Sequence, residues 1–137
     1  VREEGFDPAK FYVNLVEYKE MVVQLFRYIL EHADGCVLFH CQAGKDRTGI
    51  LAMLLLGICG VSKEDIIANY QVSHTYLRDH VELRIRDGLE ELEYSRPEWS
   101  GAAYAHIIEE YGPFRKYLLS AGLKKKDIRR IRRKLVL

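Results

Sequence analysis

Residues 40–49 read His-Cys-Gln-Ala-Gly-Lys-Asp-Arg-Thr-Gly, and these residue types at this spacing are suited to phosphate chemistry. A free cysteine thiol has a pKa of about 8.5, so little of it is thiolate at neutral pH. Successive backbone N–H groups in a tight loop, with the positive end of a helix beginning near Thr48, would lower that pKa. The same N–H groups would bind the oxygens of a phosphoryl group. The segment therefore predicts an anion site with the nucleophile Cys41 at its floor.

Three further residues fit this site. Arg47 follows Cys41 by six positions, so a curled loop would return its guanidinium to a phosphate above the sulfur. There it could hold two oxygens and stabilise charge in the transition state. Gly44 allows the backbone to approach an anion closely or to take a positive φ. Thr48 can donate its hydroxyl to the thiolate.

Taken singly, these residues have ordinary explanations, because most cysteines after an apolar strand are core packing and most Arg or Lys side chains are solvated. Their combination at a strand-to-helix junction favours a phosphate site. The nucleotide-binding loop G-x-x-x-x-G-K-[ST] is excluded, because Asp46 stands where the Mg²⁺-binding hydroxyl belongs and Phe39 where the first glycine belongs.

The elements expected to position the loop are mostly helical. An apolar run over 36–40 predicts a strand before it, and another over 50–56 predicts a buried helix over about 48–59 after it. Apolar spacing and capping residues predict further helices over about 16–33, 62–72, 76–93, 95–111, 114–120 and 126–135.

The string over 40–49, with His-Cys, five further residues and Arg-Thr-Gly, resembles the signature loop of the cysteine-dependent protein tyrosine phosphatases. The central Ala-Gly-Lys-Asp is similar to one subgroup, the bacterial and fungal tyrosine/serine phosphatases that also act on phosphoinositides. Later segments resemble the C-terminal helices of that family: 60–73, 96–112, 117–118 and 122–135. The resemblance covers most of the chain.

The resemblance implies a two-step reaction that needs neither a metal ion nor a cofactor. Cys41 attacks phosphorus and forms a phosphocysteine, a general acid protonates the leaving oxygen, and water then hydrolyses the intermediate. Arg47 and the loop amides hold the phosphoryl group throughout. The substrates implied are phosphotyrosine, and also phosphoserine/threonine or phosphoinositides.

The residues expected to bind substrate are Gln42, Ala43, Gly44, Lys45, Asp46 and Arg47. Asp46 is also a candidate general acid, which requires a raised pKa against the effect of its basic neighbours. The alternative is that Asp46 braces the loop by accepting backbone N–H bonds. Lys45 is expected to add charge at the rim, suiting a multiply phosphorylated head group, or else to pair with an acidic side chain. His40 is expected to be a hydrogen-bonded orienting residue.

The fold class expected is α/β. One strand cannot form a sheet, and a strand as apolar as 36–40 needs neighbours on both sides. The resembled family has a central, mainly parallel sheet flanked by helices, and most of its strands precede the signature loop. We therefore expect residues 1–137 to be the helical C-terminal portion of a single phosphatase domain, with the N-terminal strands missing or supplied by another chain. Any signal peptide would lie in the missing part, which leaves the location open between cytoplasm and secretion.

Composition sets further bounds. With 137 residues and 48% hydrophobic content, the chain supports one domain with a real core. A net charge of +1 gives no indication of a nucleic-acid partner, but residues 124–137 hold eight Lys/Arg and one Asp. This basic segment either contacts an anionic membrane or is a docked helix with a solvated basic face. Three cysteines argue against a disulfide framework, and the apolar run of 50–59 is too short to span a membrane.

Two other functions remain open. The loop could belong to a non-catalytic phosphate-binding module. It could also serve another enzyme of the Cys-five-residues-Arg type, such as an arsenate reductase or a sulfurtransferase. Such an enzyme would need a resolving cysteine or a sulfur-transfer loop, and Cys59, the downstream cysteine, lies in the apolar helix. The oligomeric state is left open.

Overall fold

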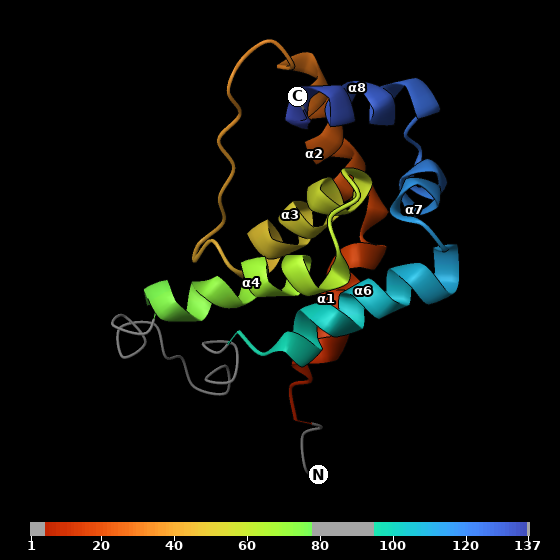
Figure 1. Ribbon diagram of the computed structural model, residues 1–137. Helices are drawn as coiled ribbons and strands as arrows, with labels where there is room; N and C mark the ends of the chain where they lie inside the picture. The colour runs from red at the N-terminus through yellow and green to blue at the C-terminus, as the bar shows by residue number, and fades with distance from the viewer. Residues whose placement is uncertain (1–4, 78–94, 137) are drawn as a thin grey trace.

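The computed structural model describes residues 5–77 and 95–136, and helices dominate this part of the chain. These helices are α1 (Pro8–Glu17), α2 (Lys19–Glu31), α3 (Asp46–Ile58), α4 (Lys63–Leu77), α6 (Pro97–Tyr111), α7 (Phe114–Ala121) and α8 (Lys125–Leu135). Figure 1 shows α3 in the middle, with α2 and α8 toward one end of the molecule and α1, α4 and α6 toward the other.

Local sequence explains where several helices begin and end. Asp7 caps α1, because its Oδ1 accepts hydrogen bonds from the backbone N–H groups of Ala9 and Lys10 at 3.0 and 3.3 Å. Ser62 caps α4 in the same way, accepting from the N–H of Asp65 at 3.1 Å. At its C-terminal end α7 is stopped by Gly122, whose φ of 117° is unfavourable for other residues.

Helix α3 is apolar on nearly all sides, which requires it to be buried. Its buried side chains are Ile50, Leu51, Met53, Leu54, Leu55 and Ile58. It packs against α1, α4, α6, α7 and α8. Because the 40–49 segment runs directly into α3, this packing also sets where the loop lies in the molecule.

The strand predicted over 36–40 is not present, and no strand occurs in the residues that the structure describes. The segment is an irregular connection from the end of α2 to the start of α3 (Figure 1). Val37 and Phe39 pack partly against the core while Leu38 is 87% exposed, so side chains alternate as they would in a strand. No other described segment lies alongside to complete a hydrogen-bonded ladder, and a strand cannot form without one. The sheet expected for an α/β fold is therefore not observed in the described residues.

The helix predictions fared better. Those over 48–59, 95–111, 114–120 and 126–135 are confirmed by α3, α6, α7 and α8, with small shifts of the ends. The helix predicted over 16–33 corresponds to α2, which begins after the backbone turns at Tyr18 (φ −77°, ψ 64°). Helix α1, which ends at Glu17 before that turn, was not predicted from the sequence. Helix α4 continues past its predicted end to Leu77. Most of the helix predicted over 76–93 lies outside the described residues.

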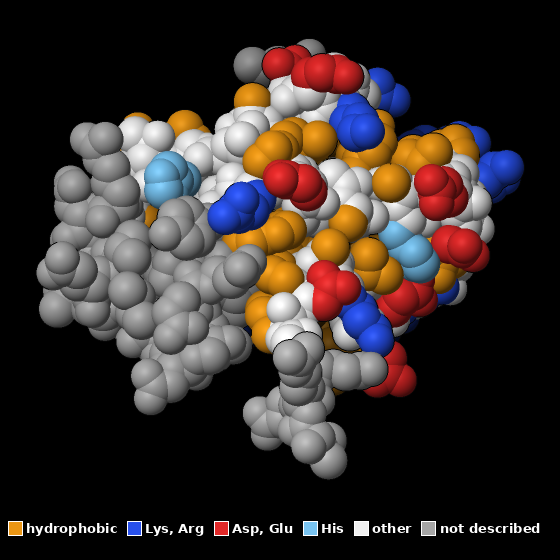
Figure 2. Space-filling model, turned by 90° about the horizontal axis from the view of Figure 1, so that it is seen from below, with side chains coloured by type: hydrophobic (Ala, Val, Ile, Leu, Met, Phe, Trp, Pro, Cys, Tyr) orange, Lys and Arg blue, Asp and Glu red, His pale blue; other side chains and the backbone are white. Residues whose placement is uncertain are grey.

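Cys36, Cys41 and Cys59 are free thiols. Among the described residues, no helix has both the length and the apolarity to cross a membrane. Figure 2 shows a face on which acidic and basic side chains alternate among exposed hydrophobic ones, with no large region of a single charge.

Candidate active site

The 40–49 segment curls at the N-terminus of α3, as its sequence predicts. Gly44 has a φ of 66°, in the left-handed region that favours glycine. A Cβ added at Gly44 would meet no atom within 4 Å. Glycine is therefore needed here for backbone conformation and not for lack of space.

Cys41 lies half-buried in this loop with an acidified thiol. Burial raises the pKa of Cys41, but the Thr48 side chain and the backbone N–H groups of Thr48, Ala43 and Gly44 lower it to about 7. The buried Thr48 hydroxyl forms no well-aligned hydrogen bond. The backbone N–H groups therefore stabilise the Cys41 thiolate more securely than this hydroxyl does. About half of the thiol is then thiolate at neutral pH, the form that acts as a nucleophile.

Arg47 lies against α1 and α2. Its exposed side chain lines a small apolar hollow whose other residues are Leu15, Met21, Val22, Leu25, Ile50, Leu51 and Leu54. Within the described part of the chain, its guanidinium makes no hydrogen bond or ion pair. The return of Arg47 to a phosphate above Cys41 therefore stays a prediction.

Lys45 points into the protein. Its side chain is fully buried, with Nζ 3.3 Å from Asp46 Oδ1 and 5.5 Å from the centroid of the Trp99 ring. The expectation of a positive charge at the rim is wrong for this arrangement, and the alternative of an ion pair with an acidic side chain is confirmed. The reason is physical, because a buried ammonium needs compensating partners, which the carboxylate and the aromatic face supply.

Asp46, the first residue of α3, connects the loop to two other helices. Its Oδ1 accepts a hydrogen bond from the hydroxyl of Tyr12 in α1. The Tyr12 hydroxyl lies 2.7 Å from that of Tyr70 in α4. The sequence alternative had Asp46 bracing the loop through backbone N–H groups, whereas its partners here are Tyr12 and Lys45.

The remaining predicted site residues of the loop differ in exposure and in their contacts. His40 is exposed, with Nδ1 3.2 Å from the Cys41 carbonyl oxygen. Gln42 is exposed, while Ala43 is half-buried and directs its N–H at the thiol. The orienting role expected of His40 and the substrate-binding roles of Gln42 and Ala43 stay predictions.

Sequence reasoning missed the aromatic side chains behind the loop. Tyr12 and Tyr70 meet edge to face with ring centroids 5.6 Å apart, and the Trp99 ring lies 6.4 Å from that of Tyr12. These residues come from α1, α4 and α6, far apart in the chain. The sequence contained only a slight signal for them. A buried tyrosine needs a hydrogen-bond partner for its hydroxyl, but the sequence does not identify that partner.

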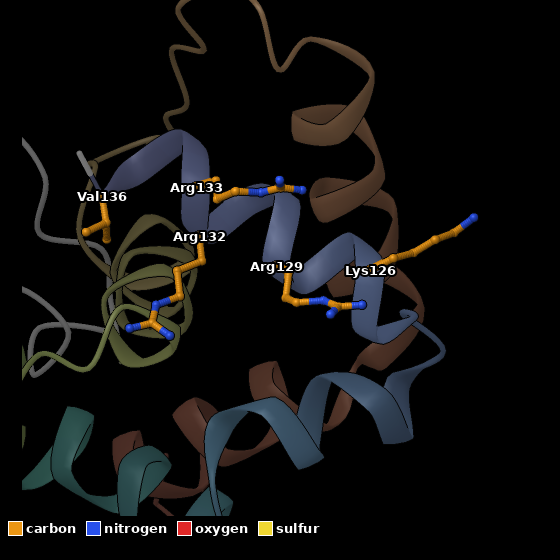
Figure 3. A pocket seen from close by; sticks show the side chains of 5 residues that line it. All are labelled: Lys126, Arg129, Arg132, Arg133 and Val136. Carbon is orange, nitrogen blue, oxygen red and sulfur yellow. The ribbon is translucent and has the colours of Figure 1, made fainter.

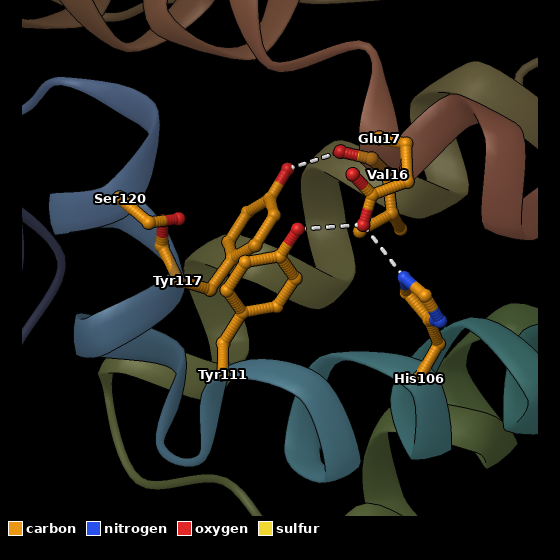
Figure 4. Close-up of polar contacts among 6 residues, drawn as sticks. All are labelled: Val16, Glu17, His106, Tyr111, Tyr117 and Ser120. Atoms are coloured by element: carbon orange, nitrogen blue, oxygen red, sulfur yellow. Dashed lines mark hydrogen bonds and ion pairs between the residues drawn. The ribbon is translucent and has the colours of Figure 1, made fainter.

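A second polar cluster joins the end of α1 to α6 and α7. Glu17 Oε1 lies 2.6 Å from His106 Nε2 and accepts a hydrogen bond from the Tyr111 hydroxyl at 2.7 Å. The Tyr117 hydroxyl donates to the Val16 carbonyl at 2.6 Å. Figure 4 shows both tyrosine rings directed at the end of α1. This cluster secures the helix that carries Tyr12 and contributes no group to the loop.

Comparison with known proteins agrees with the geometry of the loop. The model of the tyrosine phosphatase family matches residues 5–137. A tyrosine-protein phosphatase of Nostoc commune is 39% identical over 127 residues, covering 82% of this chain and 43% of that protein. The triple specificity protein phosphatase PtpB of Mycobacterium tuberculosis is 32% identical over 119 residues, covering 70% of this chain and 42% of that protein. The chain thus spans less than half the length of these relatives.

Proposed function

The chain belongs to the tyrosine phosphatase family, and from this we propose that it carries the phosphate-binding loop and the nucleophile of a cysteine-dependent phosphatase. The observation that supports the proposal best is the half-buried Cys41 within a curl of backbone N–H groups at the start of α3. We take residues 5–137 as part of one domain of this family.

In the first step, the Cys41 thiolate attacks the phosphorus of a phosphoric monoester. The S–P bond forms as the P–O bond to the leaving group breaks, and the leaving oxygen takes a proton from the carboxyl group of Asp46. The loop N–H groups and Arg47 hold the phosphoryl oxygens, which requires the guanidinium to turn from α2 toward the loop.

In the second step, water attacks the phosphorus of the phosphocysteine. The S–P bond breaks and returns the electron pair to the Cys41 sulfur, while the Asp46 carboxylate accepts a proton from the water. Inorganic phosphate leaves and the enzyme is restored. Covalent catalysis thereby replaces one difficult hydrolysis with two easier displacements.

The preferred substrate we propose is an aryl phosphate ester, phosphotyrosine in a protein. With Lys45 turned inward and paired with Asp46, this arrangement offers no rim cation from the loop for a second phosphate group. A multiply phosphorylated inositol lipid, or phosphoserine/threonine, is a second candidate, since PtpB bears the name triple specificity phosphatase. The test of this preference is to compare the turnover of three substrates: a phosphotyrosine peptide, a phosphoserine peptide and a phosphoinositide.

Other enzymes of the Cys-five-residues-Arg type are less well supported. A resolving thiol would have to reach Cys41, but Cys59 follows the C-terminal end of α3 and Cys41 precedes its start. The 13 residues of that helix separate them by about 20 Å. A disulfide needs Cα atoms within about 7 Å. Cys36 precedes Cys41 by five residues in a connection with strand-like alternation. Their Cα atoms would be about 16 Å apart if this connection were fully extended, which is also too far for a disulfide.

The test is hydrolysis of p-nitrophenyl phosphate by the complete natural protein and by its Cys41→Ser variant, without metal and with reductant. Turnover by the natural protein and its loss in Cys41→Ser is the expected result. Turnover that survives in Cys41→Ser would contradict the cysteine mechanism. Inorganic phosphate binding without turnover in either protein would identify a non-catalytic phosphate-binding module.

We also propose that α8 contacts anionic membrane lipid. Its exposed basic side chains are Lys125, Lys126, Arg129, Arg130, Arg132 and Arg133. Ile128 and Ile131 on the other side are buried in the core. Figure 3 shows four of the basic side chains and Val136 around a hollow of about 480 Å³. Leu135 and Val136, about half exposed, supply an apolar tip. Each such charge is worth about 1 kcal/mol near an anionic surface.

Sedimentation with phosphatidylcholine vesicles, with and without phosphatidylserine, tests this contact. Binding should require phosphatidylserine, weaken with salt and fall in Arg129→Glu/Arg133→Glu. The matched control is Arg115→Glu/Lys116→Glu, two exposed residues of α7. If both double variants lost vesicle binding equally, the net charge of the protein would explain the binding, and the proposal that α8 makes the contact would be wrong.

A further inference from the structure

Tyr12 is a fully buried residue of α1 whose hydroxyl reaches the loop. It donates a hydrogen bond to Asp46 Oδ1 and lies 2.7 Å from the Tyr70 hydroxyl. Thirty-four residues separate Tyr12 from Asp46 in the chain. A contact over this distance depends wholly on how α1 packs against α3.

The direction of these hydrogen bonds follows from counting hydrogens. A phenol has a single O–H, and the hydrogen of Tyr12 goes to Asp46. Tyr70 must therefore donate its own hydrogen to the Tyr12 oxygen. The three groups form a directed chain that runs from Tyr70 through Tyr12 to Asp46 Oδ1.

The phenol of Tyr12 remains a donor over the working range of pH. Burial raises its pKa well above the ordinary value, and the charges of Asp46 and Tyr70 act in the same direction. Asp46 Oδ1 therefore accepts a hydrogen bond from Tyr12 throughout this range of pH. Lys45 Nζ lies 3.3 Å from the same oxygen. Asp46 Oδ2 makes no hydrogen bond or ion pair with another described residue.

From this asymmetry we propose that Tyr12 is a positioning residue that makes Asp46 Oδ2 the oxygen that carries the transferred proton. When the Asp46 carboxyl is protonated, Oδ1 is already accepting, so the proton sits on Oδ2. It then passes from Oδ2 to the leaving oxygen as the P–O bond breaks, and Oδ2 recovers a proton from the attacking water. The inference rests on the proposed phosphatase function and adds a residue that the family motif does not contain.

A purely structural role for Tyr12 predicts something different. Removing a buried hydroxyl destabilises a protein when its partner is left unpaired, and this loss slows turnover of every substrate alike. A misplaced general acid instead slows the release of poor leaving groups more than good ones, because only poor ones need the proton. The leaving group therefore separates the two roles.

The experiment compares kcat/KM for phenyl phosphate, with its poor leaving group, and p-nitrophenyl phosphate, with its good one. The constant kcat/KM reports the step in which the leaving group departs. In Tyr12→Phe of the complete natural protein, we expect kcat/KM to fall about tenfold or more for phenyl phosphate and about twofold for p-nitrophenyl phosphate.

Tyr117→Phe is the matched control. Tyr117 is also a fully buried tyrosine, and its hydroxyl donates to the Val16 carbonyl at 2.6 Å without touching the loop. This variant loses the same atom and a similar hydrogen bond, so it should leave the ratio of the two kcat/KM values unchanged. Tyr70→Phe should change that ratio in the same direction as Tyr12→Phe and to a smaller extent.

Three outcomes would overturn the inference, and only one would also overturn the proposed function. A natural protein without turnover removes both. If Asp46→Asn leaves the ratio unchanged, Asp46 is not the acid and Tyr12 positions nothing catalytic. The proton transfers proposed for Asp46 then fall as well, while the phosphatase function and the role of Cys41 stand. If Asp46→Asn changes the ratio but Tyr12→Phe matches Tyr117→Phe, Tyr12 is structural and the proposed function stands.

Discussion

The ring of Phe114, the first residue of α7, lies directly against the backbone of Gly57 in α3. A Cβ built on Gly57 would come within 2.7 Å of ring carbons, a distance that such atoms do not tolerate. Phe114 is 6% exposed and belongs to the core, so it has little room to withdraw. The absence of a side chain at Gly57 therefore sets how closely α7 approaches the central helix.

Replacing Gly57 by alanine should destabilise the protein despite the better helix propensity of alanine. Overpacking a core typically costs about 1–3 kcal/mol. Thermal unfolding of Gly57→Ala should show a lower Tm than the unsubstituted protein. Gly101→Ala in α6 is the matched control, because its Cβ would sit 3.8 Å from Ile67, an ordinary contact. That variant should keep or raise the Tm, and an equal fall in both would contradict the steric explanation.

The Cys41 thiolate should titrate near neutrality. With its pKa lowered to about 7, Cys41 should be alkylated by iodoacetamide at a rate that rises with pH and reaches half its maximum near pH 7. Thr48→Val, which removes the hydroxyl and keeps the shape, should move this midpoint upward. Peptide mass spectrometry resolves Cys41 from Cys36 and Cys59. A midpoint unchanged in Thr48→Val would assign the whole effect to the backbone N–H groups.

The left-handed backbone at Gly44 should be required for the loop. An ordinary L-residue pays about 1–2 kcal/mol for this conformation, and asparagine tolerates it best. Gly44→Val should therefore raise the alkylation midpoint of Cys41 and lower kcat/KM more than Gly44→Asn does. Because the space around Gly44 is open, side-chain size is not the cause. Equal effects of Val and Asn would show that the conformation is unimportant.

Glu17 should stabilise the fold in a manner that depends on pH. Partial burial raises the pKa of Glu17, but the hydrogen bonds from His106 and Tyr111 and the charge of Lys19 lower it below its ordinary value of 4.5. A carboxyl whose pKa is lower in the folded state stabilises above the unfolded pKa, and this contribution is lost as the pH falls through the folded value. The Tm difference between the unsubstituted protein and Glu17→Gln should thus be largest above pH 4.5 and shrink below it.

The control for this prediction is Glu20→Gln. Glu20 is an exposed residue of α2 that makes no hydrogen bond or ion pair with the described residues. Its replacement should change the Tm less than Glu17→Gln does above pH 4.5, because a first-turn carboxylate contributes only a weak, solvent-screened interaction with the helix dipole. A Glu17→Gln difference that stayed constant below pH 4.5 would mean that the carboxylate charge contributes nothing at this site.

Local chemistry made the conformation of the 40–49 loop predictable from the sequence. The spacing of Cys41, Gly44 and Thr48 lies within a single curl, so the N–H groups around the thiol and the positive φ of Gly44 follow from neighbours in the chain. The apolar run after the loop likewise predicted α3, because a helix that is apolar all round has to be buried wherever it sits.

Partners distant in the chain decided the rest. The segment over 36–40 has the composition of a strand, yet a strand exists only beside another, and the described residues supply none. Whether Lys45 faced the rim or the core depended on Trp99 and Asp46, and the ion pair inside the protein prevailed. Tyr12 became part of the candidate site because α1 and α4 pack against α3. The sequence by itself determined the curl of the 40–49 loop around the Cys41 thiol through short-range geometry. Only the tertiary structure decided which side chains stand behind the loop, because those contacts depend on how separate helices pack.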